Sequence, residues 1–564
     1  MRRPDGSGQD TAFINRELRG VTGITHDSTS VRPGDLYAAL PGSRHHGAEF
    51  CAQAAAAGAV AVLTDPAGRD RAIQSDLPVF VVSDPRARLG EVASWVYGNP
   101  SGRLLLIGVT GTSGKTTSTY LIESGFARAG HLTGLIGGVE TRIGGIAESA
   151  RLTTPEATEL QAMFAVMAEQ RVTAAVMEVS SHALALGRVA GTSYEVAVFT
   201  NLSQDHLDFH ADMEGYFAAK AELFTPRYAK SGVVNIDDEY GRRLASKAQI
   251  PVTTYSVLGR ADADWRAAGV RCGADGSTFQ VVGPGGVEAD GSTALAGPFN
   301  VANALGAIVA LVEVGIGLDA AVAGVAACAG VPGRLERVEP GHDLTVLVDY
   351  SHKPGAVEAV LGALRPVTAG QLRIVLGCGG DRDKAKRPLM GAAAAQLADV
   401  AILTSDNPRS EDPLAILAEM LAGAITVPAD QRAHVIVEPD RAAAIELAIS
   451  GAGKGDVVLV AGKGHERGQY VAGQVIPFDD RQVAAEALAN LSAAEGSGRP
   501  ARGAAWADEP GPRDFPPARG APWTDERSSR GRQAARESTP DHEGLRGMSP
   551  GAATSPRADT PEDL

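Results

Sequence analysis

The segment at residues 109–117, with the sequence VTGTSGKTT, constrains this chain more than any other. It follows an apolar run at residues 104–107 and precedes residues 118–128, which are typical of a helix. A strand, a glycine-bearing turn and a helix in this order form a loop that binds phosphate, because the glycines let backbone N–H groups converge on the anion and the helix N-terminus adds a favourable dipole. Lys115 would then reach the terminal phosphates, and the Thr116 hydroxyl would bind Mg²⁺. The alternative is a glycine-rich turn without a ligand, but Gly-Lys-Thr after a strand favours an ATP or GTP site.

The length and composition predict a globular protein with several domains. A chain of 564 residues is too long for one hydrophobic core, and 44% hydrophobic with 21% charged residues is ordinary for a globular protein. The net charge of −15 gives a nucleic-acid partner no electrostatic support, and the four scattered cysteines predict neither a disulfide framework nor a zinc site. Residues 1–10 lack the apolar core of a signal peptide, and no apolar run approaches the ~20 residues of a membrane-spanning helix. We therefore expect a cytoplasmic protein that binds neither nucleic acid nor membrane.

Alternating strand and helix patterns divide the chain into three α/β regions and a tail. Residues 20–98 form one α/β region, residues 101–334 a second that contains the phosphate loop, and residues 335–492 a third, doubly wound and Rossmann-like. Within the second region, residues 261–293 are rich in Gly and Asp and predict a peripheral antiparallel insert. Residues 493–564 are dominated by Gly, Pro, Arg, Ser, Asp and Glu, and cannot bury enough apolar surface to offset the entropy of ordering. We predict that this tail is disordered.

Polar clusters follow the apolar strands of the second and third regions. In the second region, strands expected at 174–177 and 196–199 are followed by clusters at 178–182 and 201–210. Ligands of open α/β sheets bind beyond the carboxyl ends of the strands, so these clusters and the phosphate loop should share one edge. The third region has corresponding clusters at 349–352, 379–386, 406–409 and 462–466.

Glu178 and His206 are candidate metal ligands, because each follows a buried strand in the region of the phosphate loop. A carboxylate and an imidazole beside triphosphate oxygens suit Mg²⁺, which usually keeps some waters. Either residue alone is more often a structural hydrogen-bonding group, and their shared edge with the phosphate loop favours the metal site. The local sequence favours a surface position for Lys220. A metal role would require CO₂ to convert its amine to an anionic carbamate, and the spacing of residues does not distinguish a surface lysine from a metal ligand.

Two arginines of the third region, Arg382 and Arg409, lie in loops after successive expected strands. Arginine binds carboxylates through two parallel hydrogen bonds, so the pair suggests a site for a ligand with carboxylate groups. The alternative is two exposed loops with unrelated charges. Turn-forming Gly, Asp, Asn and Pro beside both arginines favour the site.

Taken together, these segments closely resemble the Mur ligases, the ATP-dependent amino-acid ligases of peptidoglycan precursor synthesis, over roughly residues 20–492. The resemblance implies a three-domain α/β architecture: an N-terminal domain that binds a UDP substrate, a central P-loop ATPase domain and a Rossmann-like C-terminal domain that binds the amino acid. Val109 stands where the general phosphate-loop pattern has Gly, which agrees with the form that the loop takes in these ligases. The matching motifs are TGTSGKTT at 110–117, EVSSH at 178–182, DHLDFH at 205–210, PFNVAN at 298–303, GR at 333–334, DYSH at 349–352 and GKGHE at 462–466.

The resemblance implies a role for each matching residue. The residues that would bind ATP are Gly111, Thr112, Ser113, Gly114, Lys115, Thr116, Thr117, Asn303, Arg334, Asp349 and His352. Mg²⁺ would be bound by Thr116, Glu178, His206 and Lys220, which the family carries as a carbamate (N6-carboxylysine); with Lys115, the last three would be catalytic. The UDP-muramoyl-dipeptide would be held by Ser28, Ser43, Thr153, Thr154, Ser180 and Arg188. The incoming amino acid would be held by Arg382, Asp406, Asn407, Pro408, Arg409, Gly462 and Glu466.

The implied reaction adds diaminopimelate to UDP-N-acetylmuramoyl-L-alanyl-D-glutamate. The glutamyl γ-carboxylate would attack the γ-phosphate of ATP, and the amine of diaminopimelate would then displace phosphate from the acyl phosphate. Both first reactants are anions, so catalysis would consist of positioning and charge neutralisation. Arg409 would discriminate against lysine, which lacks the distal ammonium–carboxylate centre of diaminopimelate. The resemblance favours the meso isomer and a monomer without fixing either.

Some positions depart from the family pattern. Ser113 replaces a frequent Asn in the phosphate loop, and Leu186 stands where many relatives have a Gln that touches the sugar-peptide. Lys353 and Gly355 replace a common Thr and acidic residue after the histidine-containing motif.

Two alternative functions remain. One is another ligase of the superfamily, such as folylpolyglutamate synthase or the ligase that adds D-Ala-D-Ala; the Asp-Asn-Pro-Arg segment and the first domain argue against both. The other is a nucleotide-dependent switch or scaffold without turnover. Against it stand Glu178, His206, Lys220 and Arg409.

Overall fold

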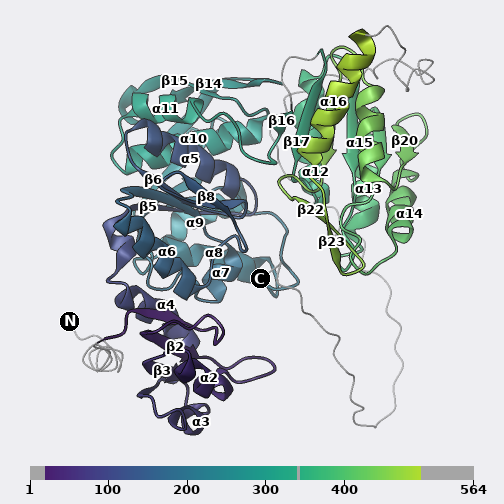
Figure 1. Cartoon of the computed structure of the whole chain (residues 1–564). Coiled ribbons are helices and arrows are strands. Elements are labelled where there is room, and N and C mark those ends of the chain that lie inside the picture. The colour runs from purple at the N-terminus through teal and green to yellow at the C-terminus, as the bar shows by residue number, and fades with distance from the viewer. Residues whose placement is uncertain (1–19, 339–342, 497–564) are drawn as a thin grey trace, which may run out of the picture. The chain divides into compact units, whose positions relative to one another are not determined.

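The computed structural model describes residues 20–338 and 343–496 (Figure 1). The described residues contain three α/β sheets and a two-stranded hairpin, which confirms the expected three-domain α/β architecture. The tail predicted to be disordered lies almost entirely outside these residues. Helix α16 (Asp480–Gly496) continues past the domain boundary predicted at residue 492.

The first sheet is parallel, with the strand order β1-β2-β3-β4. Its helix α4 begins at Pro85, because the Asp84 side chain accepts a hydrogen bond from the backbone N–H of Ala87 at 2.9 Å and the proline suits the first turn. The elements are β1 (Gly23–Thr25), β2 (Asp35–Ala39), η1 (Gly47–Phe50), α2 (Cys51–Ala56), β3 (Ala61–Thr64), α3 (Arg69–Ile73), β4 (Val79–Val81), α4 (Pro85–Val96) and η2 (Pro100–Arg103).

The central sheet has eleven strands in the order β15-β14-β13-β12-β11-β10-β5-β9-β6-β7-β8. The pairs from β13 to β6 are parallel, and both ends of the sheet are antiparallel. The peripheral antiparallel insert predicted at 261–293 is present as β13, β14 and β15, which pair antiparallel at one end of the sheet. The elements are β5 (Leu105–Thr110), α5 (Lys115–Arg128), β6 (Thr133–Ile136), β7 (Glu140–Ile143), β8 (Ile146–Ser149), α6 (Ala157–Glu169), β9 (Ala174–Glu178), α7 (Ser181–Ala185), β10 (Tyr194–Phe199), α8 (Met213–Ala221), η3 (Glu222–Phe224), β11 (Ala229–Asn235), α9 (Glu239–Lys247), β12 (Val252–Ser256), β13 (Trp265–Gly273), β14 (Gly276–Val282), η4 (Pro284–Gly286), β15 (Glu288–Thr293), α10 (Pro298–Glu313) and α11 (Leu318–Ala326).

Helices cover both faces of the central sheet, which explains its apolar strands (Figure 1). In β5, Ile107 and Val109 pack into the core formed with α5, α10 and α11. Leu104, just before β5, and Leu106 pack into the core formed with α6, α8 and α9 on the other face. This alternation follows the two-residue period of a strand.

The C-terminal sheet has the order β16-β17-β21-β18-β19-β20 and is parallel except for β16. Strand β20, at its edge, was not predicted. The elements are β16 (Glu336–Val338), β17 (Thr345–Asp349), α12 (Pro354–Leu364), η5 (Arg365–Val367), β18 (Leu372–Leu376), α13 (Lys386–Leu397), β19 (Val400–Leu403), α14 (Pro413–Ala424), β20 (His434–Val437), α15 (Arg441–Ser450), β21 (Val457–Ala461), β22 (Gly468–Val471) and β23 (Gln474–Pro477), followed by α16.

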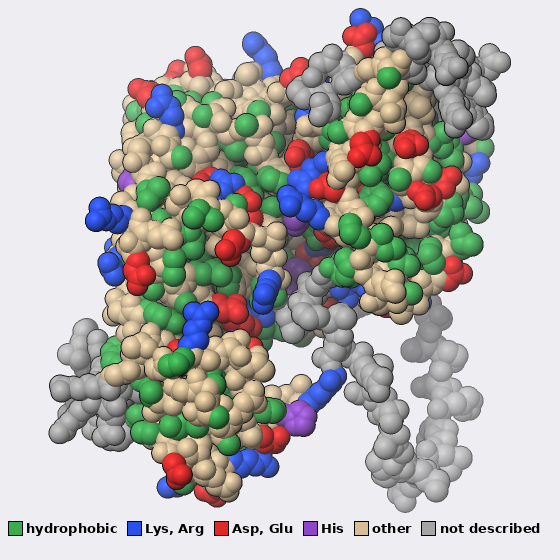
Figure 2. Space-filling model, viewed as in Figure 1, with side chains coloured by type: hydrophobic (Ala, Val, Ile, Leu, Met, Phe, Trp, Pro, Cys, Tyr) green, Lys and Arg blue, Asp and Glu red, His purple; other side chains and the backbone are tan. Residues whose placement is uncertain are grey.

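The distribution of charged side chains on the surface is consistent with the negative net charge of the chain. In the view of Figure 2, acidic and basic side chains are interspersed, and the basic ones do not form one continuous surface. Within the described ranges, no helix has the length and apolar composition needed to cross a membrane.

Candidate active site

The phosphate loop joins β5 to α5 and requires glycine at two positions. Gly111 has φ +147° and Gly114 has φ +88°. A Cβ atom would lie 1.9 Å from the Thr200 hydroxyl oxygen at the first position and 2.3 Å from the Asn303 side-chain oxygen at the second. Any larger residue would therefore displace the loop.

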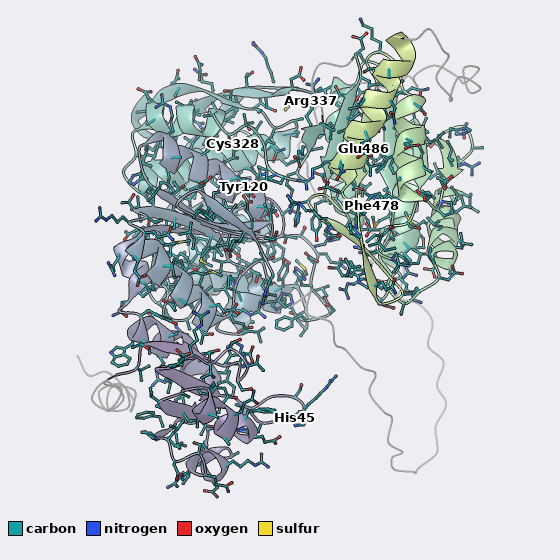
Figure 3. All side chains as sticks on the ribbon, viewed as in Figure 1. His45, Tyr120, Cys328, Arg337, Phe478 and Glu486 are labelled. Carbon is teal, nitrogen blue, oxygen red and sulfur yellow. The ribbon has the colours of Figure 1, made fainter. Side chains whose placement is uncertain are left out.

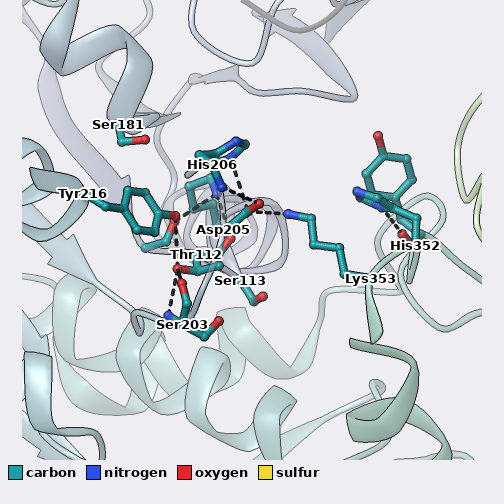
Figure 4. Close-up of polar contacts among 12 residues, drawn as sticks. Thr112, Ser113, Ser181, Ser203, Asp205, His206, Tyr216, His352 and Lys353 are labelled. Carbon is teal, nitrogen blue, oxygen red and sulfur yellow. Dashed lines mark hydrogen bonds and ion pairs between the residues drawn. The ribbon is translucent and has the colours of Figure 1, made fainter. Parts of the chain in front are cut away.

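The end of β10 braces the loop through residues that were not among the predicted ATP-binding set. The Ser113 carbonyl accepts hydrogen bonds from the Thr200 hydroxyl at 2.7 Å and from the Asn201 amide nitrogen at 3.1 Å. The Ser113 N–H donates to the Asn201 side-chain oxygen at 3.0 Å, and the Thr112 hydroxyl lies 3.1 Å from the Tyr216 hydroxyl (Figure 4). Because these contacts fix the backbone, Ser113 fills its position without the side chain of Asn.

Two lysine side chains meet at the start of the loop. Lys115 Nζ donates to the carbonyl oxygens of Gly111 and Thr112, both at 3.0 Å, and Lys220 Nζ donates to the same Gly111 oxygen at 2.9 Å. Lys220 is only 1% exposed, so it is not the surface lysine that its local sequence suggests. Burial lowers the pKa of Lys220 well below its usual range, and the charge of Lys115 lowers it further. Burial also lowers the pKa of Lys115, against the opposing effect of Glu178.

Thr116 and Glu178 are in direct contact. The Thr116 hydroxyl donates to Glu178 Oε1 at 3.0 Å, and the same oxygen accepts the Gly138 N–H at 2.9 Å. His206 lies beside Asp205, with 3.2 Å between His206 Nε2 and Asp205 Oδ2, and burial lowers the pKa of His206 to about 4. In the part of the chain that the structure describes, no three His, Cys, Asp or Glu side chains are grouped to hold a metal ion. A site here would therefore depend on Thr116, on Lys220 and on the nucleotide as well.

The other four predicted ATP-binding residues come from two regions: Asn303 from α10, Arg334 from the loop before β16, and Asp349 and His352 from the end of β17 and the loop after it. The guanidinium of Arg334 donates to the Thr116 hydroxyl at 3.3 Å and lies 4.6 Å above the centre of the Tyr350 ring. Asn303 contacts the loop at Gly114. The Asp349 side chain accepts the backbone N–H of Leu335 at 2.8 Å, and His352 Nδ1 lies 2.7 Å from the Tyr350 carbonyl oxygen, to which it donates.

The predicted muramoyl-dipeptide residues of the central region converge at the end of β9. The Thr154 hydroxyl donates to the Glu178 carbonyl at 2.9 Å and accepts the Ser180 N–H at 3.1 Å, and Ser180 caps α7. Arg188 Nε lies 2.9 Å from a carboxylate oxygen of Glu156, an ion pair that no local pattern predicts. Thr153 lies beside Gly138, with its hydroxyl 3.1 Å from the position of a Cβ there.

Ser28 and Ser43 belong to the first sheet. They lie in the loops after β1 and β2, at its carboxyl edge, where the exposed His45 also projects (Figure 3). The other predicted residues are on the second and third sheets, so these two serines form a separate group.

The predicted amino-acid site is built around a buried lysine. Lys463 is fully buried, and its Nζ donates to Asn407 Oδ1 at 2.9 Å and to Glu466 Oε2 at 3.1 Å. Asn407 Nδ2 donates to the same Glu466 oxygen at 2.9 Å. Gly462 passes so close to Asp406 that a Cβ would lie 2.6 Å from its carboxylate. Burial and the neighbouring Asp406 raise the pKa of Glu466.

Arg409 follows the buried Pro408 in a left-handed backbone conformation, with φ +52°. Its N–H donates to the Tyr470 carbonyl at 2.9 Å, and its guanidinium donates to the Gly380 carbonyl at 2.8 Å. The guanidinium is thus held against the loop after β18. Arg382 is on the same loop, partly exposed, and donates to the Asp381 carbonyl at 3.3 Å.

A buried ion pair lies beneath the loops that follow β19 and β21 in the C-terminal sheet. Arg441 and Asp480 are both fully buried and joined by two hydrogen bonds, of 2.7 and 2.6 Å. Arg441 also donates to the carbonyls of Ser405 at 3.3 Å and Ala461 at 3.0 Å. These carbonyls immediately precede Asp406 and Gly462, so the pair fixes the start of both loops.

Comparison with known proteins agrees with this arrangement. The model "Mur ligase family, catalytic domain" matches residues 20–97, "Mur ligase middle domain" residues 109–311 and "Mur ligase, glutamate ligase domain" residues 333–464. A Streptomyces avermitilis protein named UDP-N-acetylmuramoyl-L-alanyl-D-glutamate--2,6-diaminopimelate ligase is 62% identical over 482 residues, which cover 86% of this chain and 95% of that protein. A Corynebacterium glutamicum protein of the same name is 48% identical over 492 residues, covering 86% and 95%.

A solved structure bearing that enzyme name is similar over most of its length. It has a TM-score of 0.62 and 34% identity, and the match covers 84% of this chain and 95% of that one. Because relatives at such identity are matched over nearly their whole length, this chain belongs to the Mur ligase family.

Proposed function

We propose that this chain is an ATP-dependent ligase that joins diaminopimelate to the D-glutamyl γ-carboxylate of UDP-N-acetylmuramoyl-L-alanyl-D-glutamate. The observation that carries the proposal is a continuous set of hydrogen bonds through Glu178. Its carboxylate accepts from Thr116 of the phosphate loop at 3.0 Å, and its carbonyl accepts from Thr154 at 2.9 Å. The predicted nucleotide site and the predicted dipeptide site therefore meet at one residue, as direct phosphoryl transfer between their ligands requires. The relatives' names supply the choice of substrates.

The first step would form an acyl phosphate. The glutamyl carboxylate oxygen attacks the γ-phosphorus of ATP, and the bond to ADP breaks. Both reactants are anionic, so the chain's contribution is to align them and to neutralise charge. Lys115 would exchange its bonds to the Gly111 and Thr112 carbonyls for bonds to phosphate oxygens, and Arg334, beside Thr116, would add a second cation.

The second step would form the amide. The amine of diaminopimelate attacks the acyl carbon, and the tetrahedral intermediate expels phosphate. Asp406, Asn407 and Glu466 would hold the ammonium–carboxylate groups of the amino acid, with Arg409 bound to the distal carboxylate. These groups already hold one another through Lys463, so little ordering is needed when the substrate binds.

The residues at the phosphate loop fit a bound Mg²⁺ if Lys220 is modified. Thr116 and Glu178 offer hard oxygen donors, and the lowered pKa keeps the His206 imidazole neutral. Mg²⁺ in this position would neutralise charge on the phosphate oxygens. An ammonium at Lys220 would be repelled, whereas the burial that lowers its pKa favours the neutral amine that reacts with CO₂. We take Lys220 to be carbamylated, as in the family.

An ADP-release assay tests the function. We expect release that requires both the UDP-dipeptide and diaminopimelate. Release with D-Ala-D-Ala or with a folate substrate would indicate another ligase, and nucleotide binding without release under any of these conditions would indicate a switch.

Three finer points belong to the same proposal. We take the substrate to be the meso isomer, the working unit to be a monomer and the compartment to be the cytoplasm. Faster turnover with meso- than with LL-diaminopimelate, a monomer mass by light scattering and recovery of the protein in the cytoplasmic fraction are the expected results.

A further inference from the structure

Lys353 brings a positive charge from the C-terminal sheet to the phosphate loop (Figure 4). It follows His352 beyond β17 and is the N-cap residue of α12, in the extended conformation that a following proline favours. Its ammonium forms an ion pair with the carboxylate of Asp205, in the loop after β10 of the central sheet. The Lys353 side chain is 37% exposed and that of Asp205 12%, so the lysine is partly open to solvent while its partner carboxylate is mostly buried.

The partner carboxylate has a second task. Asp205 Oδ1 accepts the backbone N–H of His206 at 2.9 Å, and Oδ2 lies 3.2 Å from His206 Nε2. One carboxylate therefore contacts both a predicted metal ligand and Lys353.

Lys353 belongs to a group of cations at the predicted nucleotide site. Lys115 Nζ lies at the start of the loop, 3.0 Å from the carbonyl oxygens of Gly111 and Thr112. Arg334 adds a third cation, 3.3 Å from the Thr116 hydroxyl. Neighbouring cations repel one another, and an anion bound among them lowers the electrostatic free energy of the group. A triphosphate on the loop would be such an anion.

We propose that Lys353 is a further catalytic residue of the ligase reaction. When ATP occupies the phosphate loop, the Lys353 ammonium leaves Asp205 and donates a hydrogen bond to a non-bridging oxygen of the γ-phosphoryl group, which carries charge throughout its transfer. Lys353 forms and breaks no covalent bond and keeps its proton. In the nucleotide-free protein, Asp205 holds the ammonium close to this position.

The arrangement links phosphoryl transfer to the amino-acid site. Lys353 belongs to the same sheet edge as Asp406 and Glu466, so the charge reaches the γ-phosphate only when that edge is in place. The acyl phosphate would then form where the amine can attack it. The alternative is that the Lys353–Asp205 ion pair is permanent and only joins the two regions. The two hypotheses differ in whether loss of Lys353 weakens the binding of a nucleotide that carries a γ-phosphate.

Nucleotide binding measured by calorimetry on the full-length chain distinguishes them. The inference rests on the proposed function only in requiring an ATP site, so the probes are ADP and a non-hydrolysable ATP analogue, each with Mg²⁺. For Lys353→Met we expect about tenfold weaker binding of the analogue and unchanged binding of ADP, since one charge-assisted hydrogen bond to the γ-phosphate is lost. ADP release at saturating substrates should fall about 100-fold in kcat, because the bond strengthens in the transition state. Lys353→Gln should behave alike, and Lys353→Arg should retain most of both.

Lys454 provides the matched control. It is a lysine of the same sheet that pairs with an aspartate, Asp343, at 3.5 Å, but it lies before β21, at the opposite edge from the loops. Lys454→Met should leave both affinities and kcat unchanged. If Lys353→Met weakens ADP and the analogue equally, or weakens neither, Lys353 does not act on the γ-phosphate. If the wild-type protein binds both nucleotides but releases no ADP with the proposed substrates, the proposed function is wrong. The comparison of nucleotide affinities would still test the role of Lys353.

Discussion

The carboxyl edges of the central and C-terminal sheets hold their functional groups in different ways. At the central edge, the two lysines of the predicted catalytic set donate to the loop's own backbone, both reaching the Gly111 carbonyl. At the C-terminal edge, Asn407 and Glu466 are held by a side chain with no predicted ligand role, the buried Lys463. At the central edge, a bound nucleotide would have to replace the hydrogen bonds of the lysines to the backbone. At the C-terminal edge, a bound amino acid would leave the hydrogen bonds of Lys463 in place.

This difference separates the two halves of the reaction. Groups that exchange partners when the nucleotide arrives contribute mainly to the rate of phosphoryl transfer, because the new bonds are strongest in the transition state. Groups held in place before binding contribute mainly to affinity and selectivity. Substitutions at the central edge should therefore change kcat, and those at the C-terminal edge should change KM for the amino acid.

The largest effect is expected for Lys115→Ala. Its ammonium donates to two carbonyl oxygens of the phosphate loop, and loss of the cation on the transferring phosphoryl group should lower kcat by about 1,000-fold or more. ADP release at saturating substrates measures it, with Lys454→Met as a control of equal charge change. A variant that lost affinity for ATP but kept kcat would contradict the comparison at its central edge.

Lys220→Ala should lower kcat by about 100-fold, since removing the carbamate would remove one ligand of the metal site. Short carboxylates such as acetate should restore part of the activity by occupying the space, whereas bicarbonate alone should not. NMR with isotope-labelled bicarbonate should show a carbamate signal in the wild type and none in the variant. Full activity of the variant would remove Lys220 from the mechanism.

At the C-terminal edge, Arg409→Ala should raise KM for diaminopimelate about 10- to 100-fold, the loss of a charge-assisted contact of roughly 1.5–3 kcal/mol, with a smaller change in kcat. The preference for diaminopimelate over lysine should shrink with it. Competition between the two amino acids in one assay measures the ratio. An unchanged preference would mean that another residue reads the distal centre.

The sequence predicted the parts of both edges that depend on local pattern. The phosphate loop is recognisable because close approach at Gly111 and Gly114 leaves a glycine signature. The clusters at Glu178 and Asp406 are recognisable because they end continuous apolar runs, which are typical of buried parallel strands. Three sheets in the expected order follow from the same alternation.

Residues that act through long-range contacts could not be predicted. Arg441 begins α15 after an aspartate cap with no local sign of burial, yet the fold buries it against Asp480 beneath two loops. Lys463 likewise carries no local sign of its burial. Edge strand β20 and the hairpin strands β7 and β8 were missed because each has only four residues, none of them fully buried, so the apolar signal is weak.

The smallest expected effect tests whether the two edges are independent. The Tyr350 ring lies 4.6 Å under the Arg334 guanidinium, and its centroid is 5.2 Å from that of His465, a neighbour of Glu466. Tyr350→Leu should lose a cation–π contact of about 0.5–1 kcal/mol and raise KM for ATP about two- to fivefold, whereas Tyr350→Phe should keep it. If KM for diaminopimelate stays constant in Tyr350→Leu, the ring serves the nucleotide side alone and the edges act separately. If both KM values rise together, the stack transmits between them, and the amino-acid site is preformed only while the Arg334–Tyr350–His465 stack is intact.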